Sequence, residues 1–310
     1  MLPLPLPEGG RIGICAPAGP VKPERLQAAI AALQQTGFEV IIAPSAFAQS
    51  GLFSAPDDVR CKELEDMFTR KDVDAVFCAR GGVGSSRLLE ILNTELLVRS
   101  QKPFLGFSDI TALQWHLFGK HGFVSFSGPL AVEWDGSVNE ATQKQAIAMM
   151  RGIASEDLLK GFPRTNLKVL RGSGCVQGRL FPGNLTMITT LLGTPYLPDL
   201  RGAMLLIEDV HEPPHRVDRM LFHLRNAGVL SRIAGLFAGE LDTGMNAEER
   251  SMIAASLRDA TRGMTYPVVM GFPFGHGPER MTLPVGGLVE WNPDSMSLGL
   301  CESVTRERLT

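Results

Sequence analysis

Ser108 is the residue of this sequence best placed to act as a nucleophile. It stands in Leu105-Gly106-Phe107-Ser108-Asp109-Ile110-Thr111, where an apolar approach enters a small-residue turn and then a predicted helix. A strand, a sharp turn and a helix in this order lift the serine side chain out of the sheet and direct the free N–H groups of the helix start towards it. Attack on a carbonyl needs both a nucleophile and donors for the resulting oxyanion. The alternative is a serine that only caps the helix.

A glycine-rich turn, Arg80-Gly81-Gly82-Val83-Gly84-Ser85, follows the buried apolar run 75–79. A dinucleotide fingerprint would need a third glycine where Arg87 stands, and a Walker loop would need a Gly-Lys-Ser/Thr sequence that does not follow. The remaining functional interpretation is a loop whose bare backbone N–H groups approach a ligand and complete an oxyanion hole. A tight connection between a strand and a helix is the alternative.

A serine hydroxyl needs a base, and the base needs an orienting group. His276 lies in a flexible loop, Phe274-Gly275-His276-Gly277, directly after a predicted buried strand, where catalytic groups often collect. Glu208 ends the apolar run 204–207, and a carboxylate there must be paired or hydrated; Asp209 is an equal candidate for the acid. We expect structural or surface roles for the remaining histidines, which are His116, His121, His211, His215 and His223.

His211-Glu212-Pro213-Pro214-His215 matches the zinc-binding pattern H-E-x-x-H. That pattern requires both histidines on one face of a continuous helix. Two prolines remove backbone donors and crowd the preceding turn, so we expect the segment to begin a helix over 216–227 instead. The sequence therefore predicts no metal site, and no other motif indicates a cofactor.

Composition narrows the class of protein. The 310 residues are 44% hydrophobic and 20% charged, with a net charge of −3, which is typical of a globular protein with no nucleic-acid partner. The N-terminal stretch is broken by three prolines and carries no Lys or Arg, so it does not match a signal peptide, and no apolar run is long enough to span a membrane. Five widely spaced cysteines without a C-x-x-C pair indicate a reducing compartment, so we expect a cytoplasmic protein.

The elements expected around these residues alternate between strands and helices, which predicts an α/β fold with a parallel sheet in the first half. Strands are expected over 11–16, 38–43, 75–79, 103–105 and 123–129, and later over 167–170, 174–180, 203–208, 233–239 and 268–270. Helices are expected over 24–35, 57–70, 88–97, 109–119 and 139–151, and later over 184–192, 216–227 and 247–262. We expect an N-terminal domain over 1–155, a linker over 156–166 and a C-terminal β/α domain over 167–310, in which the stretch from Leu283 onward forms a β-hairpin region.

Several of these motifs, in this order, resemble those of the LD-carboxypeptidases, a serine peptidase family that includes murein tetrapeptide carboxypeptidases and microcin C immunity peptidases. The resemblance extends from about residue 10 to about residue 290. The segments that carry it include Arg80-Gly81-Gly82-x-Gly84, Gly106-Phe107-Ser108-Asp109-Ile110-Thr111, Ser127-Gly128-Pro129, Gly183-Asn184-Leu185, Leu206-Ile207-Glu208-Asp209 and Gly275-His276.

The resemblance implies a triad of Ser108 as nucleophile, Glu208 as acid and His276 as base, in a cleft between the two domains. It also implies an oxyanion hole from the backbone N–H groups of Asp109 and Gly82. Val83 departs from the aromatic residue common in that loop. Members of the family are typically homodimers.

The expected reaction is hydrolysis of an L,D-amide bond that releases a terminal D-amino acid, such as D-alanine from a muropeptide tetrapeptide in cell-wall recycling. Arg80 is a candidate for binding the free carboxylate of the substrate, with a surface arginine as the alternative. Substitution of the Asp109 side chain is expected to cost little activity. Two other functions remain open: cleavage of a peptidyl-nucleotide antibiotic, as in the microcin C immunity peptidases, and non-catalytic binding of cell-wall fragments.

Overall fold

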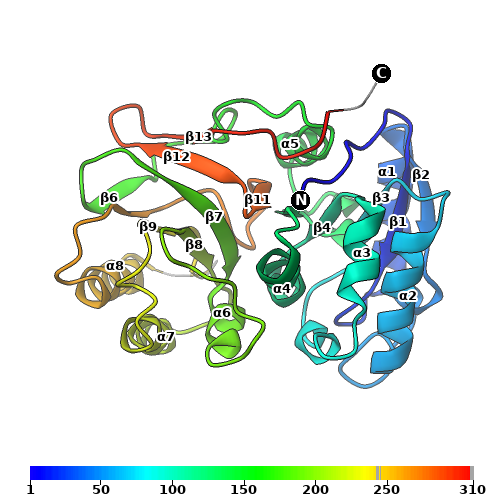
Figure 1. Cartoon of the computed structure of the whole chain (residues 1–310), viewed down its shortest axis with the longest axis horizontal. Helices are drawn as coiled ribbons and strands as arrows, with labels where there is room; N and C mark the ends of the chain where they lie inside the picture. The colour runs from blue at the N-terminus through cyan, green and yellow to red at the C-terminus, as the bar shows by residue number, and fades with distance from the viewer. Residues whose placement is uncertain (242–243, 245, 308–310) are drawn as a thin grey trace.

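The chain folds around two β-sheets that lie side by side (Figure 1). A computed structural model of the 310-residue chain describes residues 1–241, 244 and 246–307. One sheet collects most strands of the N-terminal half and the other collects most strands of the C-terminal half, with helix α4 (Thr111–His121) between them in Figure 1. The predicted fold, a parallel-sheet α/β unit followed by a mixed β/α unit, is confirmed.

The first sheet has the strand order β11-β5-β4-β3-β1-β2. All neighbouring pairs are parallel except β11 and β5, as expected of strands joined by helical crossovers. The central strands are apolar and fully buried, which explains why their sequence runs are continuous rather than alternating. The strands are β1 (Arg11–Cys15), β2 (Glu39–Ile42), β3 (Ala75–Cys78), β4 (Phe104–Gly106), β5 (Ser125–Ser127) and β11 (Leu283–Val285).

The helices of this half are α1 (Pro23–Gln35), α2 (Asp57–Thr69), α3 (Thr94–Ser100), α4 and α5 (Glu140–Met150). One expectation is wrong: the stretch 88–97 is not one helix. A 3₁₀ turn over Ser85–Leu88 comes first, and α3 begins only after Asn93, whose side chain accepts a hydrogen bond from the N–H of Leu96 (3.2 Å). This N-cap starts a new helix where the apolar spacing alone predicted a continuous one.

The second sheet has the order β13-β12-β7-β8-β9-β10-β6. Strands β7 to β10 are parallel, and β6, β12 and β13 pair antiparallel at the edges. The strands are β6 (Lys168–Arg171), β7 (Val176–Asn184), β8 (Met204–Glu208), β9 (Gly235–Ala238), β10 (Val268–Met270), β12 (Leu288–Asn292) and β13 (Ser297–Leu300). The helices are α6 (Leu185–Leu191), α7 (Pro214–Asn226) and α8 (Ala247–Ala260).

Helix α7 begins at Pro214, so His211 and Glu212 lie before it, as the two prolines predicted. His211 has a φ of 60°, which lies outside the helical region. The two histidines of the H-E-x-x-H match therefore do not share a helix face.

Strand β11 joins the first sheet, although it lies within the expected C-terminal domain. The chain after residue 167 does not remain in the second sheet, because Leu283–Val285 crosses back and pairs antiparallel with β5 of the first sheet. Pro284 lacks an N–H donor, which an edge strand tolerates. The β-hairpin region expected from Leu283 onward is confirmed, since β12 and β13 pair antiparallel there. The linker over 156–166 stays a prediction, and residues 242–243, 245 and 308–310 of the proposed second domain lie outside the described residues.

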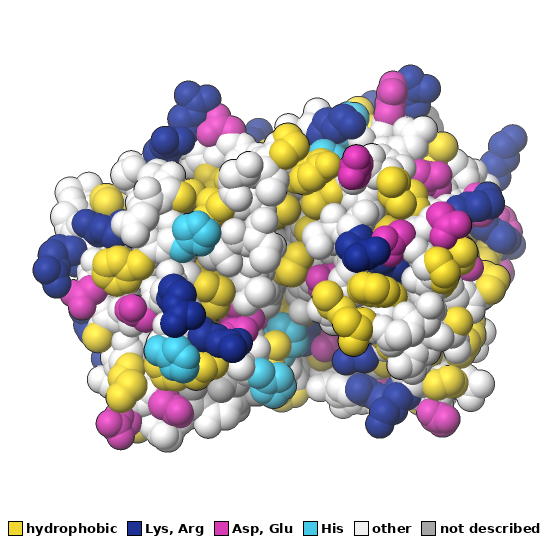
Figure 2. All heavy atoms as spheres, turned by 90° about the horizontal axis from the view of Figure 1, so that it is seen from below, with side chains coloured by type: hydrophobic (Ala, Val, Ile, Leu, Met, Phe, Trp, Pro, Cys, Tyr) yellow, Lys and Arg dark blue, Asp and Glu magenta, His cyan; other side chains and the backbone are white. Residues whose placement is uncertain are grey.

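The two halves meet along α4 and the end of β7. The indole N–H of Trp115 donates to the carbonyl of Pro182 (2.9 Å), and the N–H of Asn184 donates to Thr111 Oγ1 (3.1 Å). At Gly183 a Cβ would lie 2.7 Å from Thr111 Cγ2, so only glycine permits this approach. Figure 2 shows the surface notched between the two halves, with histidine side chains along the notch. Within the described ranges, no helix is long and apolar enough to cross a membrane.

Candidate active site

Ser108 occupies a strained turn between β4 and α4. Its φ is 61°, in the left-handed region that a non-glycine residue rarely adopts. Gly106 makes the turn possible, because a Cβ there would lie 2.4 Å from Ile110 Cγ2. The side chain of Ser108 is partly exposed at the head of the short 3₁₀ turn Ser108–Ile110 that leads into α4. This is the geometry expected of a nucleophile elbow.

His276 and Glu208 are joined by a hydrogen bond of 2.8 Å between Nδ1 and Oε2. Glu208 is the last residue of β8 and is fully buried, whereas 21% of the His276 side chain is exposed. An ionised carboxylate can only accept, so the imidazole carries its proton on Nδ1 and leaves Nε2 free to accept another. The structure thus holds the imidazole in the tautomer that a general base requires.

The structure separates the two candidate acids. Among the described residues, Asp209 forms no hydrogen bond with His276; its carboxylate accepts hydrogen bonds from the N–H and the hydroxyl of Thr186 (2.9 and 2.8 Å) at the start of α6. Asn184 links the two carboxylates, because its Nδ2 donates to Glu208 Oε1 (3.2 Å) and to Asp209 Oδ1 (3.0 Å). Asn184 stands in Gly183-Asn184-Leu185, one of the segments that carry the family resemblance, but no role was predicted for it from the sequence.

Packing beneath the imidazole fixes its position. The ring of His276 lies against the ring of Phe107, with 4.9 Å between centroids, and Phe107 also packs edge-on against Phe274 (5.4 Å). The guanidinium of the buried Arg280 lies 3.9 Å from the Phe107 ring centre and forms two hydrogen bonds with Glu133 (2.7 and 2.8 Å). The residue that precedes the serine therefore supports the histidine.

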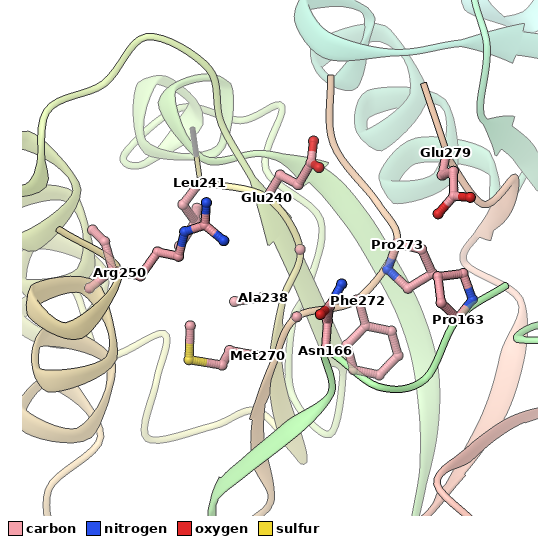
Figure 3. Close-up of a pocket in the computed structure, with 13 residues that line it drawn as sticks. Pro163, Asn166, Ala238, Glu240, Leu241, Arg250, Met270, Phe272, Pro273 and Glu279 are labelled. Carbon is pink, nitrogen blue, oxygen red and sulfur yellow. The ribbon is translucent and has the colours of Figure 1, made fainter. Parts of the chain in front are cut away.

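Glu240 supports the loop that carries His276. Its Oε2 accepts the N–H of Gly277 (2.8 Å), and a Cβ at Gly275 would lie 2.5 Å from Glu240 Cβ. Glu240 also lines a cavity of about 290 Å³ together with Arg250 and Glu279 (Figure 3). The lining of that cavity does not include Ser108, Glu208 or His276, so it is separate from the site.

Phe107 connects Ser108 to His276, because Phe107 precedes Ser108 in the chain and its ring packs against the imidazole. Within the described part of the chain, Ser108 Oγ has no hydrogen-bond partner. In enzymes without substrate such contacts are often long and tighten only when substrate binds.

The glycine turn after β3 lies directly against Ser108. A Cβ at Gly81 would lie 3.0 Å from Ser108 Cβ and 3.3 Å from its Oγ, and Gly82 has a φ of 99° that favours glycine. Among the described residues, the N–H groups of Gly82 and Asp109 make no backbone or side-chain hydrogen bond. Two free backbone donors beside a serine are what an oxyanion hole requires.

Asp109 has a side-chain role that the sequence did not predict. Its buried carboxylate accepts the N–H of Ser85 (2.8 Å), and the Ser85 hydroxyl donates to the carbonyl of Asp109 (2.5 Å). Burial raises the pKa of this carboxyl group, and the hydrogen bonds from Ser85 act in the opposite direction. The carboxylate thereby links the glycine turn to the turn that carries Ser108. Substitution of Asp109 should therefore lower the activity more than the sequence indicated.

Arg80 is exposed, and its Nη1 donates to the carbonyl of Pro20 (2.8 Å). Val83 is 46% exposed. Among the other histidines, His211, His215 and His223 are exposed, and His121 Nε2 forms a hydrogen bond with Thr94 Oγ1 (2.8 Å). His116 is buried edge-on against Tyr196, and burial lowers its pKa to about 4. No group of three or more potential metal ligands occurs among the residues with described positions.

Comparison with known proteins decides the family. The model of the LD-carboxypeptidase N-terminal domain matches residues 12–128, and the model of the C-terminal domain matches residues 177–291. The "Probable murein peptide carboxypeptidase" of Bacillus subtilis is 31% identical over 94% of this chain and 91% of its own. The chain belongs to the LD-carboxypeptidase family.

Two solved structures extend the comparison. The muramoyltetrapeptide carboxypeptidase from Oxalobacter formigenes is 32% identical, covers 94% of this chain and 97% of its own, and superposes with a TM-score of 0.79. A variant of the microcin C7 self-immunity protein MccF in complex with adenosine monophosphate has a TM-score of 0.89 over 99% of this chain and 100% of its own. At 23% identity the second similarity concerns the fold alone.

Proposed function

We propose that this LD-carboxypeptidase family member is a serine carboxypeptidase with Ser108 as nucleophile, His276 as base and Glu208 as the orienting acid. The observation that carries the proposal is the 2.8 Å hydrogen bond from His276 Nδ1 to the buried Glu208, beside a serine held at a φ of 61°. Burial of an acid is costly unless it is paired, and this acid is paired with an imidazole whose other nitrogen is free.

In the proposed mechanism, His276 Nε2 takes the proton of Ser108 while Oγ attacks the carbonyl carbon of the scissile amide. The tetrahedral oxyanion accepts hydrogen bonds from the N–H groups of Asp109 and Gly82. His276 then protonates the leaving amine, and the C–N bond breaks to give an acyl-serine and a free amino acid. Water, deprotonated by His276, hydrolyses the ester and restores Ser108.

We propose an L,D-amide as the bond that is cleaved, with release of D-alanine from a muropeptide tetrapeptide. Support comes from the relatives named for murein peptide and muramoyltetrapeptide carboxypeptidase activity, both more than 30% identical. A peptidyl-nucleotide substrate is the second candidate, because the family that the sequence resembles includes microcin C immunity peptidases. Non-catalytic binding of cell-wall fragments is the third, and the strained elbow and free backbone donors argue against it.

A carboxypeptidase must also bind the free carboxylate of its substrate, and we propose Arg80 for this task. Arg80 stands at the entrance of the glycine turn, and its guanidinium uses Nη1 to bond Pro20. Its remaining N–H groups can form the paired hydrogen bonds that suit a carboxylate. The expected result of Arg80→Gln is a rise in KM with a smaller effect on kcat.

Incubation of the protein with muropeptide tetrapeptide, with free D-alanine measured by mass spectrometry, tests the function. The wild type should release D-alanine and react with a fluorophosphonate probe at Ser108, and Ser108→Ala should do neither. Full activity of Ser108→Ala would refute the assignment of the nucleophile. Probe labelling together with cleavage of a peptidyl-nucleotide but not of the tetrapeptide would favour the second candidate function.

We further propose that the protein acts as a cytoplasmic homodimer. The support is the family resemblance and the pattern of widely spaced cysteines typical of a reducing compartment. Light scattering coupled to size-exclusion chromatography should give twice the mass of 33.6 kDa. Fractionation of the source cells should recover the protein with cytoplasmic markers.

A further inference from the structure

The loop after β1 lies beside the glycine turn that faces Ser108. Strands β1 and β3 are parallel neighbours, with Cys15 opposite Cys78, so the loops that follow them meet at the same sheet edge. The N–H of Gly19 donates to the carbonyl of Gly81 (2.9 Å). A Cβ at Gly19 would lie 2.9 Å from that same oxygen and 3.6 Å from Gly82 Cα. Only glycine fits here without displacing the turn.

The loop that carries Gly19 is itself held firmly, because four of its carbonyl groups accept hydrogen bonds from other parts of the chain. The buried Ser54 supplies two of these bonds, the buried Arg60 a third and Arg80 the fourth. The bonds are Ser54 Oγ to Ala16 (2.6 Å), Ser54 N to Ala18 (3.1 Å), Arg60 Nη1 to Pro17, and Arg80 Nη1 to Pro20 (2.8 Å). Arg60 also donates to the carbonyl of Gly84 (3.0 Å), which ties this loop to the glycine turn at a second point.

The orientation of one peptide unit depends on this contact. The C=O and N–H of a trans peptide point in opposite directions. Because Gly19 holds the Gly81 carbonyl on its own side, the N–H of Gly82 points away from the loop of Gly19. That N–H is without a partner in the described chain, and Gly81 lies against Ser108 Oγ.

We propose that Gly19 is a positioning residue that sets the Gly81–Gly82 peptide so that the Gly82 N–H faces the oxyanion formed on attack by Ser108. The inference rests on the proposed function of the site. Two adjacent glycines have few steric barriers to rotation of the peptide between them. Without the bond from Gly19 this peptide can turn over, and the carbonyl oxygen of Gly81 then takes the place of the donor.

The main test is Gly19→Ala, with kcat and KM measured on the muropeptide tetrapeptide. Loss of one oxyanion-hole donor lowers kcat by about 100- to 1000-fold in enzymes of this type. We expect a loss of that size in kcat, with KM changed less than about threefold, since the oxyanion forms only in the transition state. The matched control is Gly174→Ala, because Gly174 is exposed and a Cβ there meets nothing within 4 Å. The control should keep wild-type kcat and KM.

A second variant tests the proposal in case Gly19→Ala does not fold. Ser54→Ala keeps every glycine and removes only the hydroxyl bond to the Ala16 carbonyl. We expect a smaller fall in kcat, about three- to tenfold, with KM unchanged and with a cooperative unfolding transition whose free energy is lower by about 1–3 kcal/mol. A wild-type kcat in a folded Gly19→Ala protein would overturn the proposal. Tetrapeptide affinity is measured by calorimetry in a Ser108→Ala background, with and without Gly19→Ala. A loss of affinity as large as the loss of kcat would also overturn the proposal.

The rate of fluorophosphonate labelling separates this inference from the function on which it rests. Attack of Ser108 on the probe places an oxygen in the same oxyanion hole, whatever the natural substrate is. If the wild type reacts with the probe but not with tetrapeptide, the proposed substrate is wrong. In that case slower labelling of Gly19→Ala than of Gly174→Ala still supports the role of Gly19, and equal rates refute it.

Discussion

Replacement of Glu208 by glutamine tests the proposed role of the buried acid, whose two oxygens each have a hydrogen-bond partner. The change preserves the shape of the side chain and removes its charge. Asn184 Nδ2 donates to Glu208 Oε1 (3.2 Å), and its amide cannot easily turn over, because its Oδ1 accepts the N–H of Met187 (3.1 Å). In Glu208→Gln the amide oxygen must therefore face Asn184, and the new NH₂ group must face His276.

This forced orientation reverses the hydrogen bond at His276. An NH₂ group donates, so Nδ1 has to accept and the imidazole proton moves to Nε2, the nitrogen that should receive the proton of Ser108. The equivalent acid-to-amide change in chymotrypsin-type proteases lowers kcat by about 10⁴-fold for the same reason. We expect kcat to fall by about 10³- to 10⁴-fold, or about 4–5.5 kcal/mol of transition-state stabilisation, with little change in KM.

Release of D-alanine measures kcat, and ¹⁵N NMR of the imidazole reports which nitrogen carries the proton. The wild type should show the proton on Nδ1 and Glu208→Gln should show it on Nε2. Glu140→Gln is the matched control, because Glu140 is exposed on the first turn of α5. A Glu208→Gln enzyme with kcat within tenfold of the wild type would refute the assignment of Glu208.

Three other substitutions test separate parts of the structure. In Gly81→Ala the new Cβ lies 3.0 Å from Ser108 Cβ, so kcat/KM for the tetrapeptide should fall at least about 100-fold in a folded protein. Trp115→Phe removes the 2.9 Å bond to the Pro182 carbonyl, and urea denaturation should show a loss of about 1–3 kcal/mol. Burial lowers the pKa of His116 to about 4, so the unfolded chain binds its proton first on acidification. The free energy of unfolding should therefore fall between about pH 6.5 and pH 4, by at most about 1.4 kcal/mol per pH unit, and less steeply in His116→Gln.

Local sequence patterns predicted most elements of the fold because the central strands are apolar and fully buried. The runs at 75–79 and 203–208 became β3 and β8 with bounds shifted by no more than one residue. The elbow at Ser108 was predictable because Gly106 and the change from strand to helix lie within a few residues of it. Strand β11 could not be assigned to its sheet, because a three-residue apolar segment does not indicate which strand it will pair with.

The site could be predicted only in part, since its contacts join distant segments. Glu208 and His276 are separated by 68 positions, and it was the family resemblance rather than their spacing that paired them. The sequence indicated that Asp109 is an ordinary residue at the start of a helix. Its carboxylate nevertheless accepts a hydrogen bond from the N–H of Ser85, which lies 24 positions earlier in the chain. The catalytic roles of Ser108, Glu208 and His276 stay a prediction until the variants above are measured.

Because β11 returns to the first sheet, neither half of the chain has a complete set of its strands in one continuous segment. A fragment that ends near residue 155 would lack the strand that covers β5, and the remaining fragment would carry an unpaired Leu283–Val285 segment. The halves are thus not independent modules that could be exchanged between relatives by a single fusion point. A working chimera would need three junctions, one near residue 155 and one on each side of β11.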